Sequence, residues 1–182
     1  EVAQGLRVAG TALIVMDAKS GVDVGSELAW EYATKARVLK AFFINKMDDE
    51  NANFGKAIEA MRIKFGNSVC PIEVPIIIDR QLKGYVDLVT MKAYFWHDET
   101  MGAEYSIEEI PANLRDEAEE WRDKMLETLA EFDEALMEKY FDDPSTITVD
   151  EFKSAIRTAT LGMHVNPMTC GSSFKNKGVQ AL

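Results

Sequence analysis

The first seventy residues alternate between short apolar runs and longer segments with helical periodicity. Apolar residues are nearly continuous over 11–17, where the run ends in an acid, and again over 40–45. Runs of this kind are typical of strands buried on both faces of a parallel sheet. Residues 26–37 and 53–65 place apolar side chains every three or four positions, which predicts two amphipathic helices. This order predicts an α/β fold whose parallel strands are joined by right-handed crossovers.

The pattern changes after residue 70. Three short apolar segments predict an antiparallel meander, because they are closely spaced and separated by turn signals at Asp79-Arg80 and Lys83-Gly84; the segments are 73–78, 85–90 and 93–96. A long helix is then predicted to start with Pro111 at its first position, since apolar residues recur every third or fourth position as far as Tyr140.

A further helix is predicted over 148–163, because Thr148 and Glu151 have the spacing of a capping box. Residues 166–171 then return to the apolar strand pattern of the first part. The sequence therefore predicts three segments: a partial nucleotide-binding α/β domain over 1–70, an inserted α+β subdomain over 71–163, and a return to the first domain over 164–182.

Both ends of the chain resemble interrupted structural elements. Residues 1–8 have the pattern of a helix already in progress, and residues 178–182 that of a helix just beginning. We therefore expect the chain to be a fragment. A sheet that lacks its first strands exposes a pairing edge and an apolar face, so we also expect the chain to self-associate.

Composition narrows the possible functions. The 182 residues include 20 Lys and Arg against 31 Asp and Glu, a net charge of −11, which argues against a general binder of nucleic acid or anionic membranes. Two distant cysteines, Cys70 and Cys170, give neither a disulfide framework nor a zinc spacing. No apolar stretch is long enough for a membrane helix. These features predict a cytoplasmic protein.

The acidic residues are concentrated in the predicted insertion. Residues 98–151 contain 19 acidic and four basic side chains, whereas the rest of the chain has a small positive excess. Such asymmetry favours two units of different character. An acidic helix face is most often only solvated surface, and a docking surface for a partner is the alternative.

The tetrad Asn45-Lys46-Met47-Asp48 directly follows a predicted buried strand. Open α/β sheets bind ligands at the carboxyl ends of their strands. A carboxylate accepts two hydrogen bonds from the ring N–H and exocyclic amine of guanine, a pattern that adenine lacks. The Asn amide can brace the loop, and the Lys stem can lie over the ring. The tetrad therefore favours guanine recognition, although four residues alone are a weak motif.

A second loop follows the returning strand. Two small residues in the stretch Cys170-Gly171-Ser172-Ser173-Phe174 let backbone N–H groups approach a carbonyl oxygen of a base closely. With both loops present and an insertion between them, the chain closely resembles the bacterial elongation factor G family over essentially all 182 residues. The most specific stretches are 45–48, 83–88, 136–140 and 170–180.

The resemblance implies roles for individual residues. Asp48 would hold guanine N1 and N2, with Asn45 as the loop brace and Lys46 as the ring cover. Ser172 would steady Asp48 or its loop, and the Ser173 N–H would meet guanine O6. Phe174 also belongs to the guanine-binding set, and the ligand would be GTP or GDP.

The resemblance further implies an incomplete P-loop GTPase-type sheet, interrupted by short antiparallel strands and acidic helices. The chain has no G-x-x-x-x-G-K-[ST] stretch, and the family places its phosphate loop, switch threonine and Mg²⁺ ligands upstream. We therefore expect no catalytic residue and no metal ligand in this chain, and no GTP hydrolysis by the chain alone. Asp17 imitates a residue near a nucleotide-bound magnesium ion, but the family's metal-side acid lies upstream.

The implied function is that of a translational GTPase that drives ribosomal translocation. The implied partners are the ribosome and its stalk protein, near which the family's insertion lies. Other possibilities remain open: an acidic module that docks a ribosomal partner, a ribosome-protection protein, release factor three, or a divergent paralogue. Asp49-Glu50-Asn51, after the tetrad, departs from the family pattern and leaves the paralogue open.

Overall fold

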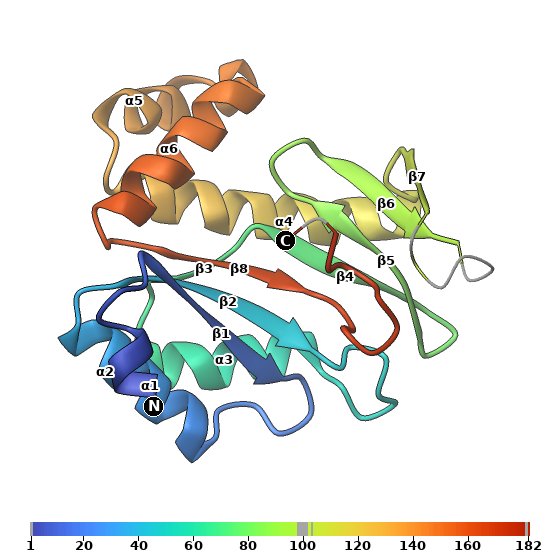
Figure 1. Cartoon of the computed structure of the whole chain (residues 1–182). Helices are drawn as coiled ribbons and strands as arrows, with labels where there is room; N and C mark the ends of the chain where they lie inside the picture. The colour runs from blue at the N-terminus through green and yellow to red at the C-terminus, as the bar shows by residue number, and fades with distance from the viewer. Residues whose placement is uncertain (1, 98–101, 103, 181) are drawn as a thin grey trace.

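A parallel four-stranded sheet forms the centre of the molecule (Figure 1). The structure is a computed structural model that describes residues 2–97, 102, 104–180 and 182. The strand order is β1-β2-β8-β3, with all neighbours parallel. The strands are β1 (Thr11–Asp17), β2 (Leu39–Asn45), β8 (Asn166–Cys170) and β3 (Val69–Pro71). The strand from the end of the chain thus inserts between β2 and β3, as expected for a fold that is interrupted and resumed.

Two amphipathic helices, α2 (Val24–Lys35) and α3 (Phe54–Phe65), follow β1 and β2. They lie on the same side of the sheet, with the short N-terminal α1 (Val2–Gly5) beside α2 (Figure 1). Phe42 of β2 and Phe65 of α3 stack at 5.4 Å between ring centroids and are both buried. The ring of Trp30 in α2 lies 5.7 Å from that of Phe42 and 4.8 Å from that of Phe65, so one aromatic cluster packs both helices against the sheet.

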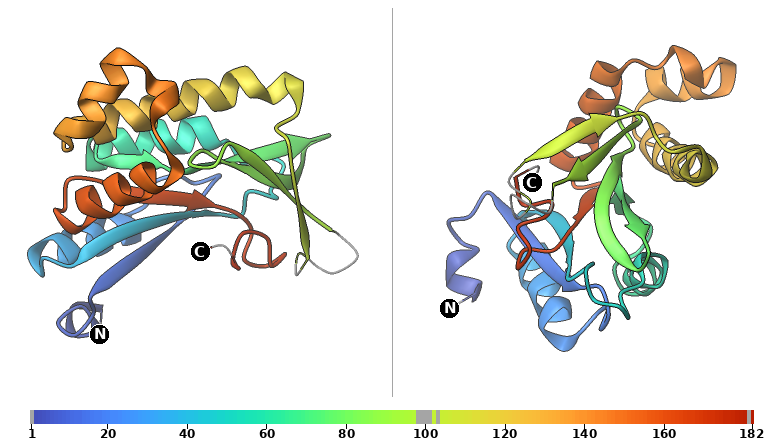
Figure 2. Two further views of the ribbon diagram at one scale, coloured as in Figure 1. Left: turned by 90° about the horizontal axis from the view of Figure 1, so that it is seen from above. Right: turned by 90° about the vertical axis from the view of Figure 1, so that its right-hand side faces the viewer.

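The second sheet is an antiparallel meander, which confirms the predicted architecture. Its order is β4-β5-β6-β7, with strands β4 (Glu73–Ile78), β5 (Gln81–Asp87), β6 (Lys92–Trp96) and β7 (Tyr105–Glu108). Four helical segments complete this half of the fold: α4 (Ala112–Ala130), α5 (Glu134–Asp142), the 3₁₀ helix η2 (Pro144–Thr146) and α6 (Val149–Leu161). Figure 2 shows α4 and α6 packed beside the two sheets.

The β4–β5 hairpin belongs to two hydrophobic cores. Val74, Ile76 and Val86 pack with α4 and α6, whereas Leu82 and Tyr85 pack with residues of the parallel sheet. The predicted insertion is therefore not a separate lobe at this point, because its first hairpin shares a core with the domain into which it is inserted.

The predicted long helix is wrong in one respect, because it is two helices. α4 ends at Ala130 and α5 begins at Glu134, where the Asp133 side chain accepts a hydrogen bond from the Leu136 N–H at 3.0 Å. This N-cap starts a new helix while the apolar spacing continues across the break. Pro111 precedes the first helical residue instead of occupying it.

The predicted turn at Lys83-Gly84 is also wrong, since both residues lie inside β5. A Cβ atom at Gly84 would lie 2.1 Å from the Tyr94 carbonyl oxygen, so this glycine permits close approach of β5 and β6. The turn at Asp79-Arg80 does join β4 and β5, with both residues at positive φ.

Other differences concern short segments. β3 and β7, of three and four residues, were not predicted, since such lengths give little periodicity. Among the described residues after Gly178 there is no helix, and Gly178 itself has a φ of +83°. Glu1 and Ala181 at the two ends, and Asp98 and Glu99 of the acidic segment, lie outside the described residues.

Candidate guanine-binding site

The carboxyl ends of three parallel strands bring the predicted site residues together. Asp17 of β1 pairs in register with Asn45 of β2, and Ile44 pairs with Cys170 of β8. The loops that follow these strands therefore start side by side at one edge of the sheet, where open α/β sheets bind ligands.

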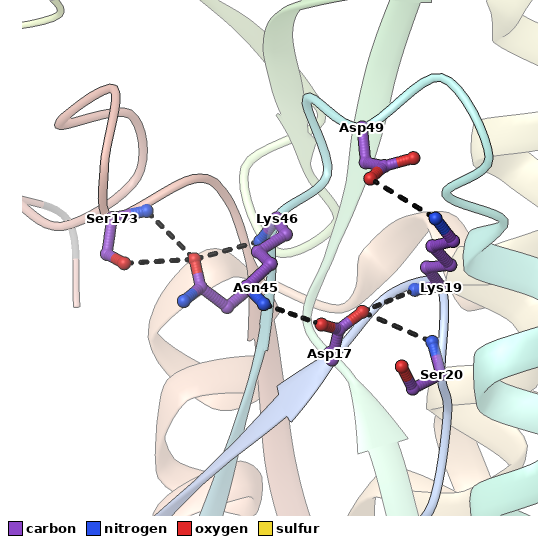
Figure 3. Close-up of polar contacts among 7 residues, drawn as sticks. All are labelled: Asp17, Lys19, Ser20, Asn45, Lys46, Asp49 and Ser173. Atoms are coloured by element: carbon purple, nitrogen blue, oxygen red, sulfur yellow. Dashed lines mark hydrogen bonds and ion pairs between the residues drawn. The ribbon is translucent and has the colours of Figure 1, made fainter.

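Asn45 joins the two predicted base loops (Figure 3). Its Oδ1 accepts hydrogen bonds from the N–H of Lys46 at 2.8 Å and of Ser173 at 2.9 Å, and the Ser173 hydroxyl lies 3.1 Å from the same oxygen. One amide oxygen thus fixes its own loop and a loop 128 residues further along the chain. The Ser173 N–H, expected at guanine O6, is engaged by Asn45 in this structure.

Lys46 is held by Asp17, a contact that the sequence did not predict. The Lys46 ammonium donates to Asp17 Oδ2 at 2.8 Å, and Asp17 Oδ1 accepts from the N–H groups of Lys19 and Ser20 at 2.9 and 3.1 Å (Figure 3). The hydrogen bond from Lys46 lowers the pKa of Asp17 and raises that of Lys46. An acid at the end of the neighbouring strand was the only sequence signal for this pair.

The second loop is closed on itself and tied to the first. The Gly171 N–H donates to Ile44 O at 2.9 Å, and the Met47 N–H donates to Gly171 O at 3.0 Å. Ser172 and Lys177 exchange two backbone hydrogen bonds of 2.9 Å each. Together these bonds hold the tetrad and the second loop in one rigid arrangement.

Ser172 lies at the base of this loop and is buried. Its hydroxyl accepts a 3.4 Å hydrogen bond from the Lys175 N–H. Within the described part of the chain, its hydrogen bonds go to Lys175 and Lys177 of its own loop and do not reach Asp48. Its position supports a role in shaping the loop.

Asp48 is half-buried and lines a cavity of about 700 Å³. Among the described residues its carboxylate has no hydrogen-bond or ion-pair partner. The other lining residues come from the β4–β5 hairpin and the second loop: Gln81, Leu82, Phe174, Lys175, Asn176 and Lys177. Phe174 is 90% exposed, and the Lys175 ammonium lies 5.7 Å from the centroid of its ring.

This arrangement fits the base of a guanine nucleotide. An ionised carboxylate offers acceptors only, and Asp48 has its acceptors available beside a cavity of suitable size. An apolar ring and the stems of nearby lysines can flank a planar heterocycle. In the described residues there is no group of three or more His, Cys, Asp or Glu side chains able to hold a metal ion.

The Cys170 thiol, next to the second loop, is inert. It is fully buried, and burial raises its pKa well above the ordinary value. The thiolate needed for reaction is therefore strongly disfavoured.

The fold is that of a GTPase domain interrupted by an α+β insertion. The elongation factor Tu GTP binding domain family matches residues 1–182, and the chain belongs to this family. It is 45% identical over all 182 residues to elongation factor G of Amoebophilus asiaticus (strain 5a2), of which it spans 26%. It also superimposes over its whole length on the crystal structure of ttk003000868 from Thermus thermophilus, with a TM-score of 0.87, 26% identity and 26% of that chain covered.

The chain thus spans about a quarter of the length of the relatives that it matches. No helix in the described ranges is long and apolar enough to cross a membrane.

Proposed function

We propose that this chain supplies the guanine-recognition half of a translational GTPase. Asp48 is the specificity determinant, Asn45 braces the two loops, and Lys46, once released from Asp17, covers one face of the ring. Ser172 and Ser173 shape the second loop, and Phe174 flanks the base. The observation that carries the proposal is that Asp48 lies at the wall of the cavity and has no hydrogen-bond or ion-pair partner among the described residues.

We expect the ligand to be GTP or GDP, since the chain belongs to a family of GTP-binding domains and is similar to an elongation factor G. When bound, the nucleotide supplies the phosphoanhydride that is cleaved, and Mg²⁺ neutralises charge on its phosphates. The described residues contribute base recognition and not phosphoryl transfer. We therefore expect no hydrolysis by the 182-residue chain alone.

Substitution of Asp48 tests the assignment. Asp48→Asn keeps one acceptor for the ring N–H and replaces the other with an amide N–H donor, which opposes the exocyclic amine of guanine and favours xanthine, which presents a carbonyl there. In the full-length protein we expect a shift of preference from GDP to xanthosine diphosphate of roughly 100-fold. Competition binding with both nucleotides measures it.

The matched control for this experiment is Asp49→Asn. Asp49 is the adjacent acid, and it pairs with Lys19 at 3.9 Å and with Asn51. It does not line the cavity that Asp48 lines, so the preference for GDP should remain. If both variants showed the same nucleotide preference, Asp48 would not be the residue that recognises the base.

The wider role that we propose is ribosomal translocation in the cytoplasm, with the ribosome as partner. It rests on the 45% identity to an elongation factor G. A ribosome-protection protein, release factor three or a divergent paralogue is the alternative. A translocation assay with the full-length protein separates them, because only a translocase advances peptidyl-tRNA on pre-translocation ribosomes.

A second candidate function is docking through the acidic helices. Glu117, Glu120 and Glu127 are exposed on α4, opposite its buried apolar side. We propose the ribosomal stalk protein as the partner. Reversal of all three charges should abolish capture of the stalk protein in a pull-down, whereas reversal of three exposed acids elsewhere, Glu31, Glu50 and Glu59, should not. Persistent capture by the α4 variant would count against this surface.

A further inference from the structure

The second base loop is held at both ends by the β4–β5 hairpin. Before the loop, the Cys170 N–H donates to Glu73 Oε1 at 2.7 Å. After it, the Lys177 ammonium donates to Leu82 O at 2.9 Å. Glu73 begins β4 and Leu82 lies in β5, so one hairpin of the predicted insertion contacts both boundaries of residues 171–176.

The Cys170 contact satisfies a backbone group that the sheet leaves without a partner. The Gly171 N–H points toward β2, where it bonds Ile44 O. Successive N–H groups along a strand point to opposite sides, so the Cys170 N–H points toward β3. β3 ends at Pro71, which is paired with Met168, and the next carbonyl along the chain, that of Ile72, accepts from the Leu88 N–H instead. Glu73 supplies the missing acceptor, and a buried N–H without one would be costly.

Glu73 itself is an unusual residue for this place, being only 5% exposed. Burial raises the pKa of its carboxyl group to about 8, the Cys170 hydrogen bond opposes this rise, and the nearby Asp87 adds to it. The other ionisable side chains around it, including those that line the neighbouring cavity of about 560 Å³, are Asp87 and Tyr85 of β5, Cys170 of β8, and Lys153 and Arg157 of α6.

The same hairpin also forms part of the wall of the candidate base pocket. Gln81 and Leu82 line the cavity of Asp48, together with residues of the second loop. The hairpin therefore contacts the loop start, the loop end and the pocket.

We infer that Glu73 is a positioning residue for base recognition: its carboxyl group fixes the start of the second loop and ties that loop to the inserted hairpin. This inference rests on the proposed guanine site. It extends that site into the insertion, because a shift of the hairpin moves the loop and a bound base restrains the hairpin. By linkage, if binding of a partner to the hairpin changes the affinity for the base, the base changes the affinity for that partner by the same factor.

Two substitutions separate positioning from stability. Glu73→Met keeps the length of the side chain and loses the acceptor, whereas Glu73→Gln keeps an acceptor at the same place. In the full-length protein we expect Glu73→Met to lower the ratio of GDP to ADP affinity about tenfold. Glu73→Gln should stay within about twofold of wild type.

Asn166→Leu is the matched control. Asn166 is a buried polar residue at the opposite end of the same strand, where its amide donates to the Ser68 hydroxyl at 3.0 Å. Its loss destabilises β8 far from the loop, so the affinity ratio should not change. If Asn166→Leu lowers the ratio as much as Glu73→Met does, the effect is general destabilisation and the inference is wrong.

Hydrogen exchange of the Cys170 amide gives a test that needs no nucleotide. In wild type and Glu73→Gln this amide should exchange at least about tenfold more slowly than in Glu73→Met. An amide that exchanges in wild type as fast as exposed turn amides would overturn the inference.

The outcomes also distinguish the inference from the proposed function. If the wild-type protein shows no preference for GDP over ADP, the proposed guanine site is wrong. If the wild-type protein has that preference and Glu73→Met has it unchanged, the guanine site stands and the inferred role of Glu73 is wrong.

Discussion

Gly171 lies where the two base loops are hydrogen-bonded to each other. A Cβ atom at this position would lie 2.3 Å from the Lys177 carbonyl oxygen and 3.0 Å from the Phe43 ring. The first contact is with backbone, which cannot rotate away as a flexible side chain can. Glycine is therefore required by close approach and not by its φ angle.

We predict that Gly171→Ala opens the second loop and lowers the affinity for guanine nucleotides at least about tenfold. Nucleotide titration of the full-length variant measures the loss. Gly55→Ala is the control, since its Cβ would meet the Asn53 side chain at an ordinary 3.7 Å inside α3. Unchanged affinity in Gly171→Ala would show that the loop geometry is not needed for binding.

The buried Glu73 carboxyl group should make the free energy of unfolding depend on pH. Its pKa is raised from 4.5 to about 8 in the folded chain, so the unfolded carboxyl group ionises at a lower pH than the folded one. The folded state then holds the extra proton, and the free energy of unfolding falls as pH rises between these values. The loss is at most about 1.4 kcal/mol per pH unit.

Glu73→Gln should flatten this part of the stability curve, because the amide does not titrate. Urea unfolding of both proteins from about pH 5 to about pH 8 checks it. Parallel curves for wild type and Glu73→Gln would show that Glu73 does not titrate in this range.

At the scale of elements, local signals predicted some boundaries well. The Thr148 and Glu151 pair forms the predicted capping box at the start of α6, with Glu151 also bonded to Lys139. That bond and the cap lower the pKa of Glu151 to about 2. The break between α4 and α5 was not predicted, because the apolar stripe runs through it and only Asp133 marks it.

We predict that Thr148→Ala lowers the free energy of unfolding by about 1 kcal/mol, because the N-terminus of α6 loses its side-chain acceptor. Ser154→Ala, at an exposed position in the middle of α6, should change it by less than about 0.5 kcal/mol. Urea denaturation compares the two variants, and equal effects would argue against the cap.

At the scale of the whole molecule, the parallel sheet and the meander followed from hydrophobic periodicity. The tetrad and the small residues of the second loop were enough to predict which strand ends meet. Asp17 and Glu73 could not be predicted as partners of Lys46 and Cys170, because such contacts join segments that only the tertiary fold brings together. The core that the β4–β5 hairpin shares with the parallel sheet could not be predicted for the same reason.

The exposed edge strand of the parallel sheet predicts self-association of the chain. β1 is an edge strand, and its Leu13 and Val15 are 43% and 54% exposed. We predict that the 182-residue chain self-associates through this edge and that Val15→Lys weakens the association. Sedimentation over a range of concentrations tests it, with Ile63→Lys on α3 as the control. A compact monomer at high concentration would contradict the prediction.

We propose above all that the two loops at residues 45–48 and 171–174 recognise guanine. The most direct measurement is hydrogen exchange of the full-length protein with GDP and with ADP at equal concentration. GDP should slow exchange in both loops, and ADP should not. Equal protection by the two nucleotides, or protection by GDP that leaves both loops unchanged, would contradict it.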